Sequence, residues 1–581
     1  MNKIVYTSLI IGLLISTKVT AQYLPKNISE VDIAKAHQWV DKTYQSLSQD
    51  EKLGQLFIVA LYTNKDENHI NQVRNIVTND KIGGLILMQD DAAREINLVN
   101  EFQQKSKVPL MIGMDAEWGL FQRIAAAHKF PWAMTLGAIQ DKALIHQMAA
   151  KIAEDCKRMG INWDFAPVVD VNTNPNNPII GNRSFGSEVN NVISSALAYT
   201  NGLQDNNILA AIKHFPGHGD TSTDSHLDLP VVSHQLDRLN NIELAPFKAL
   251  MDKGVGGVMV AHLYVPSLES GKGIPASVSK NIITGLLKEK LGYKGLIITD
   301  ALNMGAVANK YKPGELDAMA FKAGNDIMLF SQGVSEGKKL IQKAIDNGEI
   351  VQSRVEESVK KILLTKYFLG LSQYTPKSPE NINYDLNNDS HKNLVQNLYS
   401  NALTLLKDDQ KLLPLGKKQV YYVPLEEAPY QTFASQLGLE TQVIIKKANE
   451  INTIPANSTV VVGFHKDNST AYKPYKISAE SKKVLADLVK NQKVILDVFG
   501  SAYALKDIDI SKVSTVLVSY ENNNDSMTAA ANALNGKTKI WGRLPVLIND
   551  QLRAGMGIDF NSISNTNTNV SSTTFTTSKQ Q

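Results

Sequence analysis

Short runs of apolar residues recur along the first part of the chain, separated by stretches with helical periodicity. Most of these runs are apolar at consecutive positions, which is typical of strands buried on both faces of a parallel sheet. The runs are LFIVAL (56–61), GGLILM (83–88), PLMIGMD (109–115), NWDFAPVVD (162–170), ILAAIKHF (208–215), GGVMVAHLYVP (256–266), GLIITD (295–300) and AGNDIMLF (323–330).

The segments between these runs predict helices. DKALIHQMAAKIAEDCKRMG (141–160) and NIITGLLKEKLG (281–292) each combine helical spacing with a closing glycine. Strands that alternate with helices in this way predict an α/β fold, namely a (β/α)8 TIM-type barrel over residues 30–371. An open doubly wound sheet is the alternative that fits the same pattern.

A second apolar series follows a change in composition. Residues 372–390 are rich in Pro, Asn and Ser and predict a linker. The later runs predict a smaller α/β sandwich domain over residues 391–560. They are VYYVPL (420–425), TVVVGF (459–464), KVILDVFG (493–500) and TVLVSY (515–520). Residues 561–581 are polar and of low complexity, which predicts a disordered tail.

The N-terminus has the pattern of a secretory signal peptide over residues 1–21. Lys3 precedes an apolar run (9–15), and Val19-Thr20-Ala21 precedes the expected cleavage point. The apolar run is too short for a stable membrane anchor. We therefore expect an exported protein, periplasmic or extracellular, without stable membrane insertion.

Composition and charge narrow the class of protein. The formal net charge is +3, and removing the leader takes away two lysines and no acids, which leaves +1. A nearly neutral chain argues against nucleic acid as the main partner. Cys156, the single cysteine, cannot form an intramolecular disulfide, and its helical context predicts a packed thiol. Stability must then come from large cores, which this length permits.

Polar side chains gather where the predicted strands end, which is the catalytic face of a barrel. They lie at or after the ends of the third, fourth, fifth, sixth and seventh runs: Asp115, Arg123, Asp170, Arg183, Lys213, His214, His262 and Asp300. Asp300 follows a fully apolar run directly. A carboxylate there can attack an electrophilic carbon or orient a substrate. The alternative is that Asp300 caps the following helix.

The stretch KHFPGHGDTSTDSH (213–226) combines a strand end with an irregular loop rich in Gly and short polar residues. Asp224 lies two residues before His226, where a carboxylate can fix the imidazole tautomer and raise its basicity. Such a pair also occurs in polar loops without any function. A zinc site is a further alternative, but the loop lacks HExxH spacing, and the ammonium of Lys213 opposes a cation.

These features together resemble glycoside hydrolase family 3, in its β-N-acetylglucosaminidase branch. The long signature KHFPGHGDTxxDSH stands at 213–226, and the RSFG element stands at 183–186. A DxEG…R-like element begins at Asp115, and an apolar strand ends at Asp300. Trp118 departs from the glycine that the family often has there, which leaves the aglycone preference open. The segments NALTLLKDDQKLLPL (401–415) and LPVLINDQLRAGMGI (544–558) resemble the two ends of the family's second domain.

The resemblance implies roles for these residues. Asp300 would be the nucleophile, and His226 the general acid/base with Asp224 as its partner. The positions that match those holding the terminal N-acetylglucosamine are Asp115, Arg123, Arg183, Lys213 and His214. His218 and Asp220 are assigned to shaping the loop. No cofactor or metal is implied.

The implied reaction is hydrolysis with retained configuration. Asp300 attacks the anomeric carbon while His226 protonates the departing oxygen, and water then releases the sugar from the covalent intermediate. The partner is a carbohydrate ending in N-acetylglucosamine, in peptidoglycan-derived or chitin-like fragments. Three alternatives remain. The first is a phosphorylase, because an imidazole repels phosphate less than a carboxylate does. The second is a β-glucosidase, which the DSH loop argues against, and the third is a catalytically silent sugar-binding protein.

Overall fold

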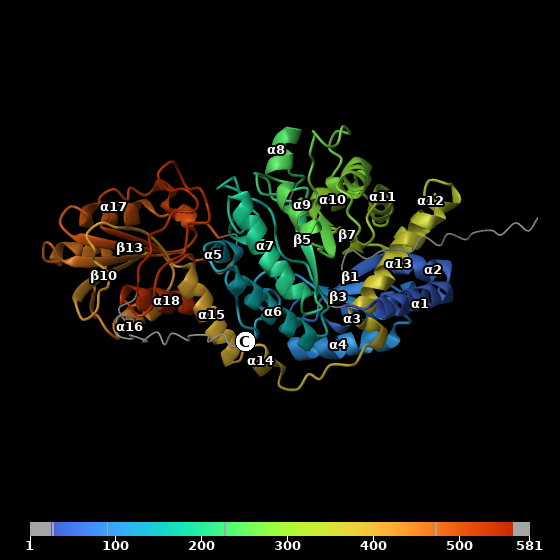
Figure 1. Cartoon of the computed structure of the whole chain (residues 1–581), viewed down its shortest axis with the longest axis horizontal. Helices are drawn as coiled ribbons and strands as arrows, with labels where there is room; N and C mark the ends of the chain where they lie inside the picture. Colours follow the sequence, from blue (N-terminus) through green and yellow to red (C-terminus); the bar gives the residue numbers. More distant parts are fainter. Residues whose placement is uncertain (1–24, 26–27, 90, 226–227, 471–472, 562–581) are drawn as a thin grey trace, which may run out of the picture.

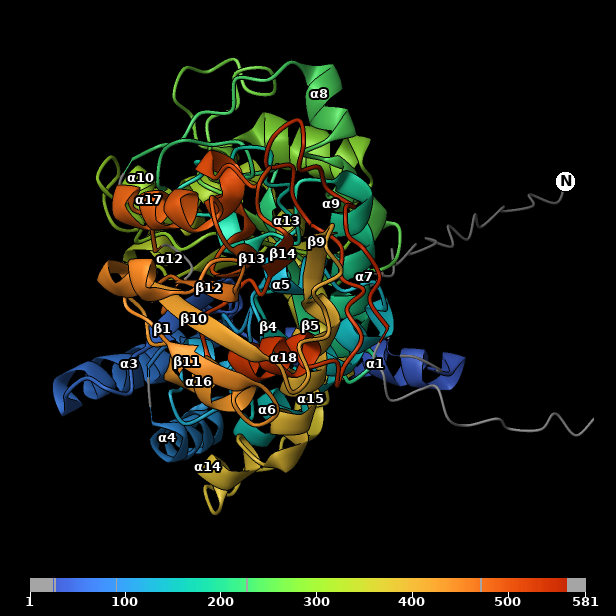
Figure 2. The ribbon, with the colours of Figure 1, turned by 90° about the vertical axis from the view of Figure 1, so that its left-hand side faces the viewer.

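The chain forms two α/β units in a computed structural model that describes residues 25, 28–89, 91–225, 228–470 and 473–561. Figure 1 shows the unit with the N-terminal strands beside the unit with the C-terminal strands, and in Figure 2 the second unit lies in front of the first. The predicted leader (1–21) lies outside the described residues, as does the predicted tail after residue 561. No helix in the described part is long and apolar enough to cross a membrane.

The first unit is a closed barrel of eight parallel strands, as predicted. The strands run in the order β7-β6-β5-β4-β3-β2-β1-β8, and a parallel bridge between Ile298 and Ile327 joins the two ends. This bridge excludes the open doubly wound sheet. The strands are β1 (Phe57–Leu61), β2 (Gly84–Leu87), β3 (Met111–Met114), β4 (Trp163–Asp164), β5 (Leu209–Phe215), β6 (Gly257–Val260), β7 (Leu296–Thr299) and β8 (Met328–Leu329).

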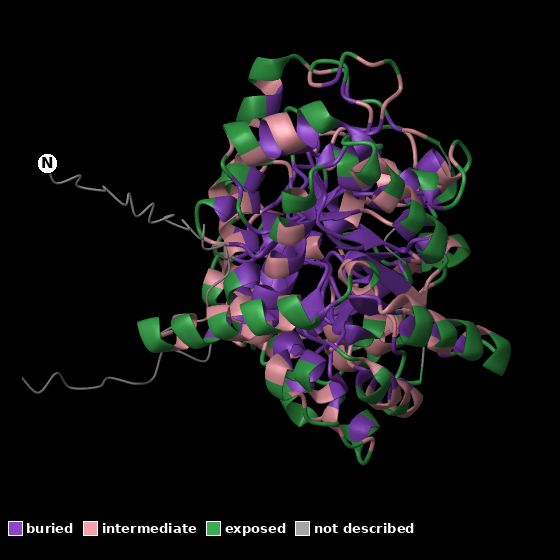
Figure 3. Ribbon diagram, turned by 90° about the vertical axis from the view of Figure 1, so that its right-hand side faces the viewer, coloured by how far each residue is buried: buried purple, intermediate pink, exposed green. Residues whose placement is uncertain are grey.

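Helices surround the barrel, and Figure 3 shows the buried strands inside a ring of helices with exposed outer faces. Helix α6 follows from its sequence: the side chain of Asp141 caps its first turn, Cys156 is buried in its core face, and Gly160 ends it at φ 78°. The segment 281–290 is also helical, but it winds as a π-helix.

The helices of this unit vary from three to eighteen residues. They are α1 (Glu30–Ser46), α2 (Gln49–Gly54), α3 (Glu67–Asp80), α4 (Ala92–Lys105), η1 (Leu120–Gln122), α5 (Ala133–Gly137), α6 (Lys142–Met159), η2 (Gly181–Arg183), α7 (Val189–Gln204), α8 (Leu236–Asn241), α9 (Ala245–Met251), η3 (Ala276–Val278), η4 (Asn281–Lys290), α10 (Gly305–Ala308), α11 (Glu315–Ala323), α12 (Val334–Asp346) and α13 (Gln352–Phe368).

The second unit contains a six-stranded sheet in the order β11-β10-β12-β13-β14-β9. Its strands are parallel except β9, which pairs antiparallel with β14. Two of them, β9 and β11, are absent from the predicted apolar runs, and β11 is half exposed along its length. The strands are β9 (Thr404–Asp408), β10 (Gln419–Leu425), β11 (Gln442–Ile445), β12 (Thr459–His465), β13 (Lys493–Phe499) and β14 (Thr515–Val518).

Short helices connect the two units and cover the second sheet. The segment predicted as a linker contains α14, and α15 leads into β9. These helices are η5 (Leu371–Gln373), α14 (Ile382–Asp385), α15 (Asp389–Ala402), α16 (Gln431–Leu437), η6 (Ala448–Thr453), α17 (Ala479–Leu488), η7 (Ala502–Asp507) and α18 (Asn524–Leu534).

Glu521 of the second unit fastens the two units together. Its carboxylate is only 2% exposed and accepts hydrogen bonds from the Trp132 backbone N–H (2.8 Å) and the Thr135 hydroxyl (2.8 Å). The Lys129 ammonium lies 3.0 Å from its other oxygen. Every one of these partners belongs to the barrel unit, immediately before or within α5. The carboxylate therefore fixes the second unit against this side of the barrel.

We expect Glu521→Ala to lower the free energy of unfolding by about 3 kcal/mol, because it leaves the Trp132 N–H buried without its acceptor. Calorimetry or denaturant unfolding measures the change. Glu521→Gln is the matched control, since its amide oxygen still accepts from Trp132 and Thr135, and it should lose less. Unchanged unfolding of the alanine variant would contradict this role.

Candidate functional site

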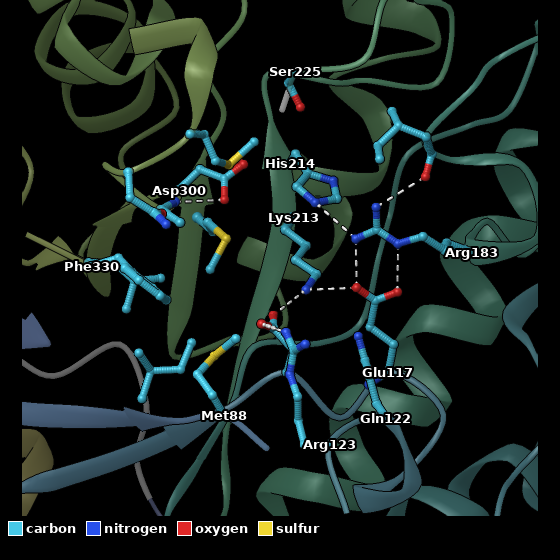
Figure 4. A pocket seen from close by; sticks show the side chains of 18 of the residues that line it. Met88, Glu117, Gln122, Arg123, Arg183, Lys213, His214, Ser225, Asp300 and Phe330 are labelled. Atoms are coloured by element: carbon cyan, nitrogen blue, oxygen red, sulfur yellow. Dashed lines mark hydrogen bonds and ion pairs between the residues drawn. The ribbon is translucent and has the colours of Figure 1, made fainter. Parts of the chain in front are cut away.

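A cavity of about 570 Å³ opens at the C-terminal ends of the barrel strands, which is the expected place for chemistry. Figure 4 shows charged side chains on one side of this cavity and Asp300 on the other. The structure brings six of the predicted site residues to its wall. They are Asp115, Arg123, Arg183, Lys213, His214 and Asp300.

The Lys213 ammonium lies at the centre of the charged side. It is 2.9 Å from a carboxylate oxygen of Asp115 and 2.8 Å from one of Glu117, and the Lys213 side chain is only 3% exposed. Burial acts to lower the pKa of Lys213, but the two carboxylates outweigh it and raise the pKa above its ordinary value. Lys213 therefore carries its charge without contact with bulk water.

Glu117 joins Lys213 to Arg183. The Arg183 guanidinium forms a two-pronged pair with the Glu117 carboxylate at 2.8 and 2.6 Å, and both side chains are buried. Burial opposes ionisation of Glu117, but Arg183 and Lys213 lower its pKa to about 2. Glu117 was not among the predicted site residues, although it stands in the DAEWG stretch. The signal in the sequence was its position two residues after the end of the third apolar run (109–115).

Asp115 joins Lys213 to Arg123. One of its oxygens faces Lys213, and the other accepts from Arg123 at 2.6 Å. Burial acts to raise the pKa of Asp115, but Lys213 and Arg123 hold it well below its usual range. The Nε atom of Arg123 is buried, and no described residue accepts its hydrogen. This network can thus offer both donors and ionised acceptors to the hydroxyl groups of a ligand.

His214 supports this network from the side. Its Nε2 lies 3.2 Å from an Arg183 nitrogen, which can only donate, so Nε2 must be the acceptor. Nδ1 therefore carries the hydrogen and donates it to Asp170 at 2.7 Å. This arrangement orients the imidazole and positions Arg183 at the cavity wall. A direct contact of His214 with sugar remains a prediction.

Asp300 lies at the opposite wall, directly after β7. Its carboxylate accepts from the Ala301 N–H at 2.8 Å, and the helix that follows begins after Met304. Asp300 is therefore not the cap of that helix. Burial acts to raise the pKa of Asp300, but the His262 and His214 rings and the Ala301 N–H lower it overall. An ionised carboxylate that faces the cavity can attack an electrophilic carbon.

His262 fixes the backbone next to Asp300. Its Nε2 donates to the Ala301 carbonyl at 3.0 Å, and its Nδ1 accepts from the Ser277 hydroxyl at 2.7 Å. The ring is fully buried. His262 is therefore a positioning residue, and its place at the end of the sixth predicted strand was visible in the sequence.

The loop after β5 buries His218. Buried His218 contacts Thr221 at 2.7 Å and Ser225 at 3.3 Å, and burial lowers its pKa to about 4. These contacts agree with the predicted loop-shaping role. Ser225 lines the cavity, and Asp224 precedes it. His226 lies outside the described residues, so its pairing with Asp224 stays a prediction.

Asp220 of this loop forms a second group with a histidine and an acid from the segment that follows. Side-chain atoms of Asp220, His234 and Glu243 come within 4.8 Å of one another, a spacing that a metal ion could use. The guanidinium of Arg238 already contacts Asp220 at 2.9 Å and Glu243 at 3.3 Å. This cation compensates the two carboxylates and would repel a metal ion.

Aromatic side chains form another part of the cavity wall. Trp118 and Trp132 stack with ring centroids 4.6 Å apart, and both line the cavity. Trp118 is the residue that departs from the family pattern, and its ring forms the edge of the cavity beside Trp132, whose N–H donates to Glu521.

Known proteins match both the sequence and the fold. Residues 48–365 match the glycosyl hydrolase family 3 N-terminal domain. β-Hexosaminidase A of Pseudoalteromonas piscicida is 32% identical over 405 residues, which covers 64% of this chain and 67% of that protein.

Solved structures extend the similarity to the second unit. The family 3 β-N-acetylglucosaminidase from Paenibacillus sp. str. FPU-7 is 28% identical, with a TM-score of 0.70 over 87% of this chain and 99% of that one. The β-glucoside phosphorylase BglX has a TM-score of 0.76 over 90% and 98%, but its 24% identity bears on the fold alone. The chain belongs to glycoside hydrolase family 3.

Proposed function

We propose that this chain is an exported, exo-acting, retaining β-N-acetylglucosaminidase that removes terminal N-acetylglucosamine from peptidoglycan-derived or chitin-like fragments. The family and its β-hexosaminidase relatives support β-N-acetylhexosaminidase activity. The observation that carries the proposal is the position of ionised Asp300 in the same cavity as the network around Lys213.

The charged network supports recognition of a chain end. Lys213 and Arg183 are buried, so they close one side of the cavity and offer hydrogen-bond donors only inward. The terminal sugar has hydroxyl groups that can both donate and accept. It can therefore donate to Asp115 and accept from Lys213, Arg123 and Arg183. A sugar in the middle of a chain would meet this closed side, which favours exo-action.

Catalysis follows from the placement of Asp300. Its carboxylate attacks the anomeric carbon, the bond to the leaving oxygen breaks, and His226 gives that oxygen a proton. In the second step His226 takes a proton from water, and the resulting nucleophile displaces Asp300 with retained configuration. The His226 ring can exchange a proton near neutral pH because the unperturbed imidazole pKa is about 6.5.

We expect Asp300→Ala to lower kcat for an aryl β-N-acetylglucosaminide by at least about 10³-fold, because the nucleophile is lost. Asp252→Ala, which removes an exposed carboxylate, is the control and should retain activity. Products with and without added phosphate complete the test. Retained turnover in Asp300→Ala would contradict the mechanism. A parent without any turnover would instead indicate a silent sugar-binding protein. Sugar 1-phosphate as main product would make the enzyme a phosphorylase.

We expect kcat/KM to fall at acid pH and at alkaline pH for different reasons, the first set by Asp300 and the second by His226. The lowered pKa of Asp300 keeps the nucleophile ionised, so loss on the acid side should begin only below its ordinary value of 3.8. On the alkaline side kcat/KM should fall as His226 loses its proton. With N-acetylglucosaminyl fluoride, whose leaving group needs no proton, this alkaline fall should disappear. An identical alkaline fall with both substrates would contradict the role of His226.

We expect Glu117→Gln to lower kcat/KM about 100-fold, because the variant leaves Lys213 and Arg183 with one counter-charge fewer and shifts both groups. Steady-state kinetics and the inhibition constant of N-acetylglucosamine measure the effect, and both should weaken together. Glu154→Gln, on the exposed face of α6, is the matched control. Parental values in Glu117→Gln would show that Glu117 does not position the sugar-binding groups.

A further inference from the structure

A second cavity of about 240 Å³ lies between the barrel and the second unit. The barrel contributes the loop 175–182, and the second unit contributes residues 473–476 together with Ser501 and Tyr503. Ile179 lines both this cavity and the larger one around Asp300. The two cavities are therefore neighbours that share one lining residue of the barrel loop.

The barrel loop 175–182, which lines the second cavity, is hydrogen-bonded to the loop that precedes His226, the proposed general acid. The Asn177 side chain donates to the His218 carbonyl at 2.8 Å, and the Asn174 side chain donates to the Thr221 carbonyl at 3.0 Å. The loop 175–182 thus packs on the segment that leads to His226. A general acid must reach the leaving oxygen, so the aglycone lies on its side of the sugar. Because Ile179 borders both cavities, an aglycone on this side of the larger cavity points toward the second one.

The lining of the second cavity suits a carbohydrate ring. Tyr475 is half-buried and offers ring surface, while Tyr503, whose ring centroid lies 5.8 Å away, is only 2% exposed and packs beside it. Pro175, Pro178 and Pro474 add flat apolar surface. The C–H faces of a pyranose pack on such surfaces, while side-chain amides can bind its hydroxyl groups. Asn182 supplies an amide at the wall. This mixture of flat apolar faces and a few polar groups is typical of a ligand site.

Three hydrogen bonds tie the two tyrosines of the second unit to the barrel segment 172–175. The Tyr475 hydroxyl donates to the Pro175 carbonyl at 3.0 Å. The Tyr503 hydroxyl both donates to the Asn172 carbonyl (3.2 Å) and accepts from the Asn172 amide (3.0 Å). Each tyrosine is thereby tethered at its tip, which leaves its ring orientation fixed. A fixed ring binds a sugar face without a large loss of side-chain entropy.

We propose that this second cavity binds the second sugar of the aglycone, so that the enzyme acts best on substrates of at least three sugar units. The proposal rests on the proposed hydrolase function. The terminal N-acetylglucosamine lies against the Lys213 network, the first aglycone sugar lies in the remainder of the larger cavity, and the next ring packs on Tyr475. The second unit thus contributes to substrate selection.

The test compares kcat/KM for β-1,4-linked N-acetylglucosamine disaccharide and trisaccharide within each variant. In the parent we expect the trisaccharide to exceed the disaccharide roughly five- to tenfold, the range for one aromatic contact. Tyr475→Ala should reduce this ratio to about one. Because it is a ratio, loss of folded protein cancels. Tyr475→Phe loses the hydrogen bond to Pro175 but keeps the ring, and it should retain the ratio.

Three outcomes would overturn the proposal: no preference for the trisaccharide in the parent, an unchanged ratio in Tyr475→Ala, or an equal loss in Tyr475→Phe. A disaccharide that bears a peptide on its reducing sugar distinguishes the occupant. If this substrate, and not the trisaccharide, shows the Tyr475-dependent gain, the site binds peptide and the assignment to a sugar is wrong. A parent that cleaves no aryl N-acetylglucosaminide would instead refute the proposed function itself.

Discussion

The buried charge of Lys213 is the constraint on which the rest of the site depends. An ammonium removed from water is costly unless carboxylates compensate it, and here Asp115 and Glu117 both do so within 3 Å. Those carboxylates in turn require Arg123 and Arg183. The requirement extends across three adjacent strands, because Asp115, Glu117 and Arg123 follow β3, Arg183 lies in the segment after β4, and Lys213 lies in β5. Parallel pairing of these neighbouring strands brings the groups together at one end of the barrel.

This constraint also relates the second unit to the site. The barrel cavity is formed by strand ends and loops, and such loops need support from packed elements. Glu521 supplies this support beside Trp132, which stacks on Trp118 at the cavity edge. The hydroxyl groups of Tyr475 and Tyr503 hold the barrel loop near Ile179. The second unit therefore holds two parts of the cavity wall, although it supplies no predicted catalytic residue.

Much of the barrel could be predicted from sequence because its strands are buried on both faces and their apolar runs are continuous. Asp115, Lys213 and Asp300 were found because they are polar residues at the ends of such runs. Glu117 was missed because its function depends on a partner 66 positions away, Arg183, which only the folded barrel brings near. Strand β11 was missed because half-exposed QVII lacks a continuous buried pattern. The hydrogen bonds of Glu521 to Trp132 and Thr135 could not be predicted, because they join residues of two different units that are far apart in the sequence.

The most direct measurement of the central claim is identification of the residue that carries the sugar during turnover. A fluorinated N-acetylglucosaminyl fluoride slows release of the covalent intermediate, and mass spectrometry of the digested protein locates the label. The account predicts one N-acetylhexosaminyl adduct on the peptide that contains Asp300. An adduct on any other residue, or turnover of the reagent without an adduct while the normal substrate is cleaved, would contradict it.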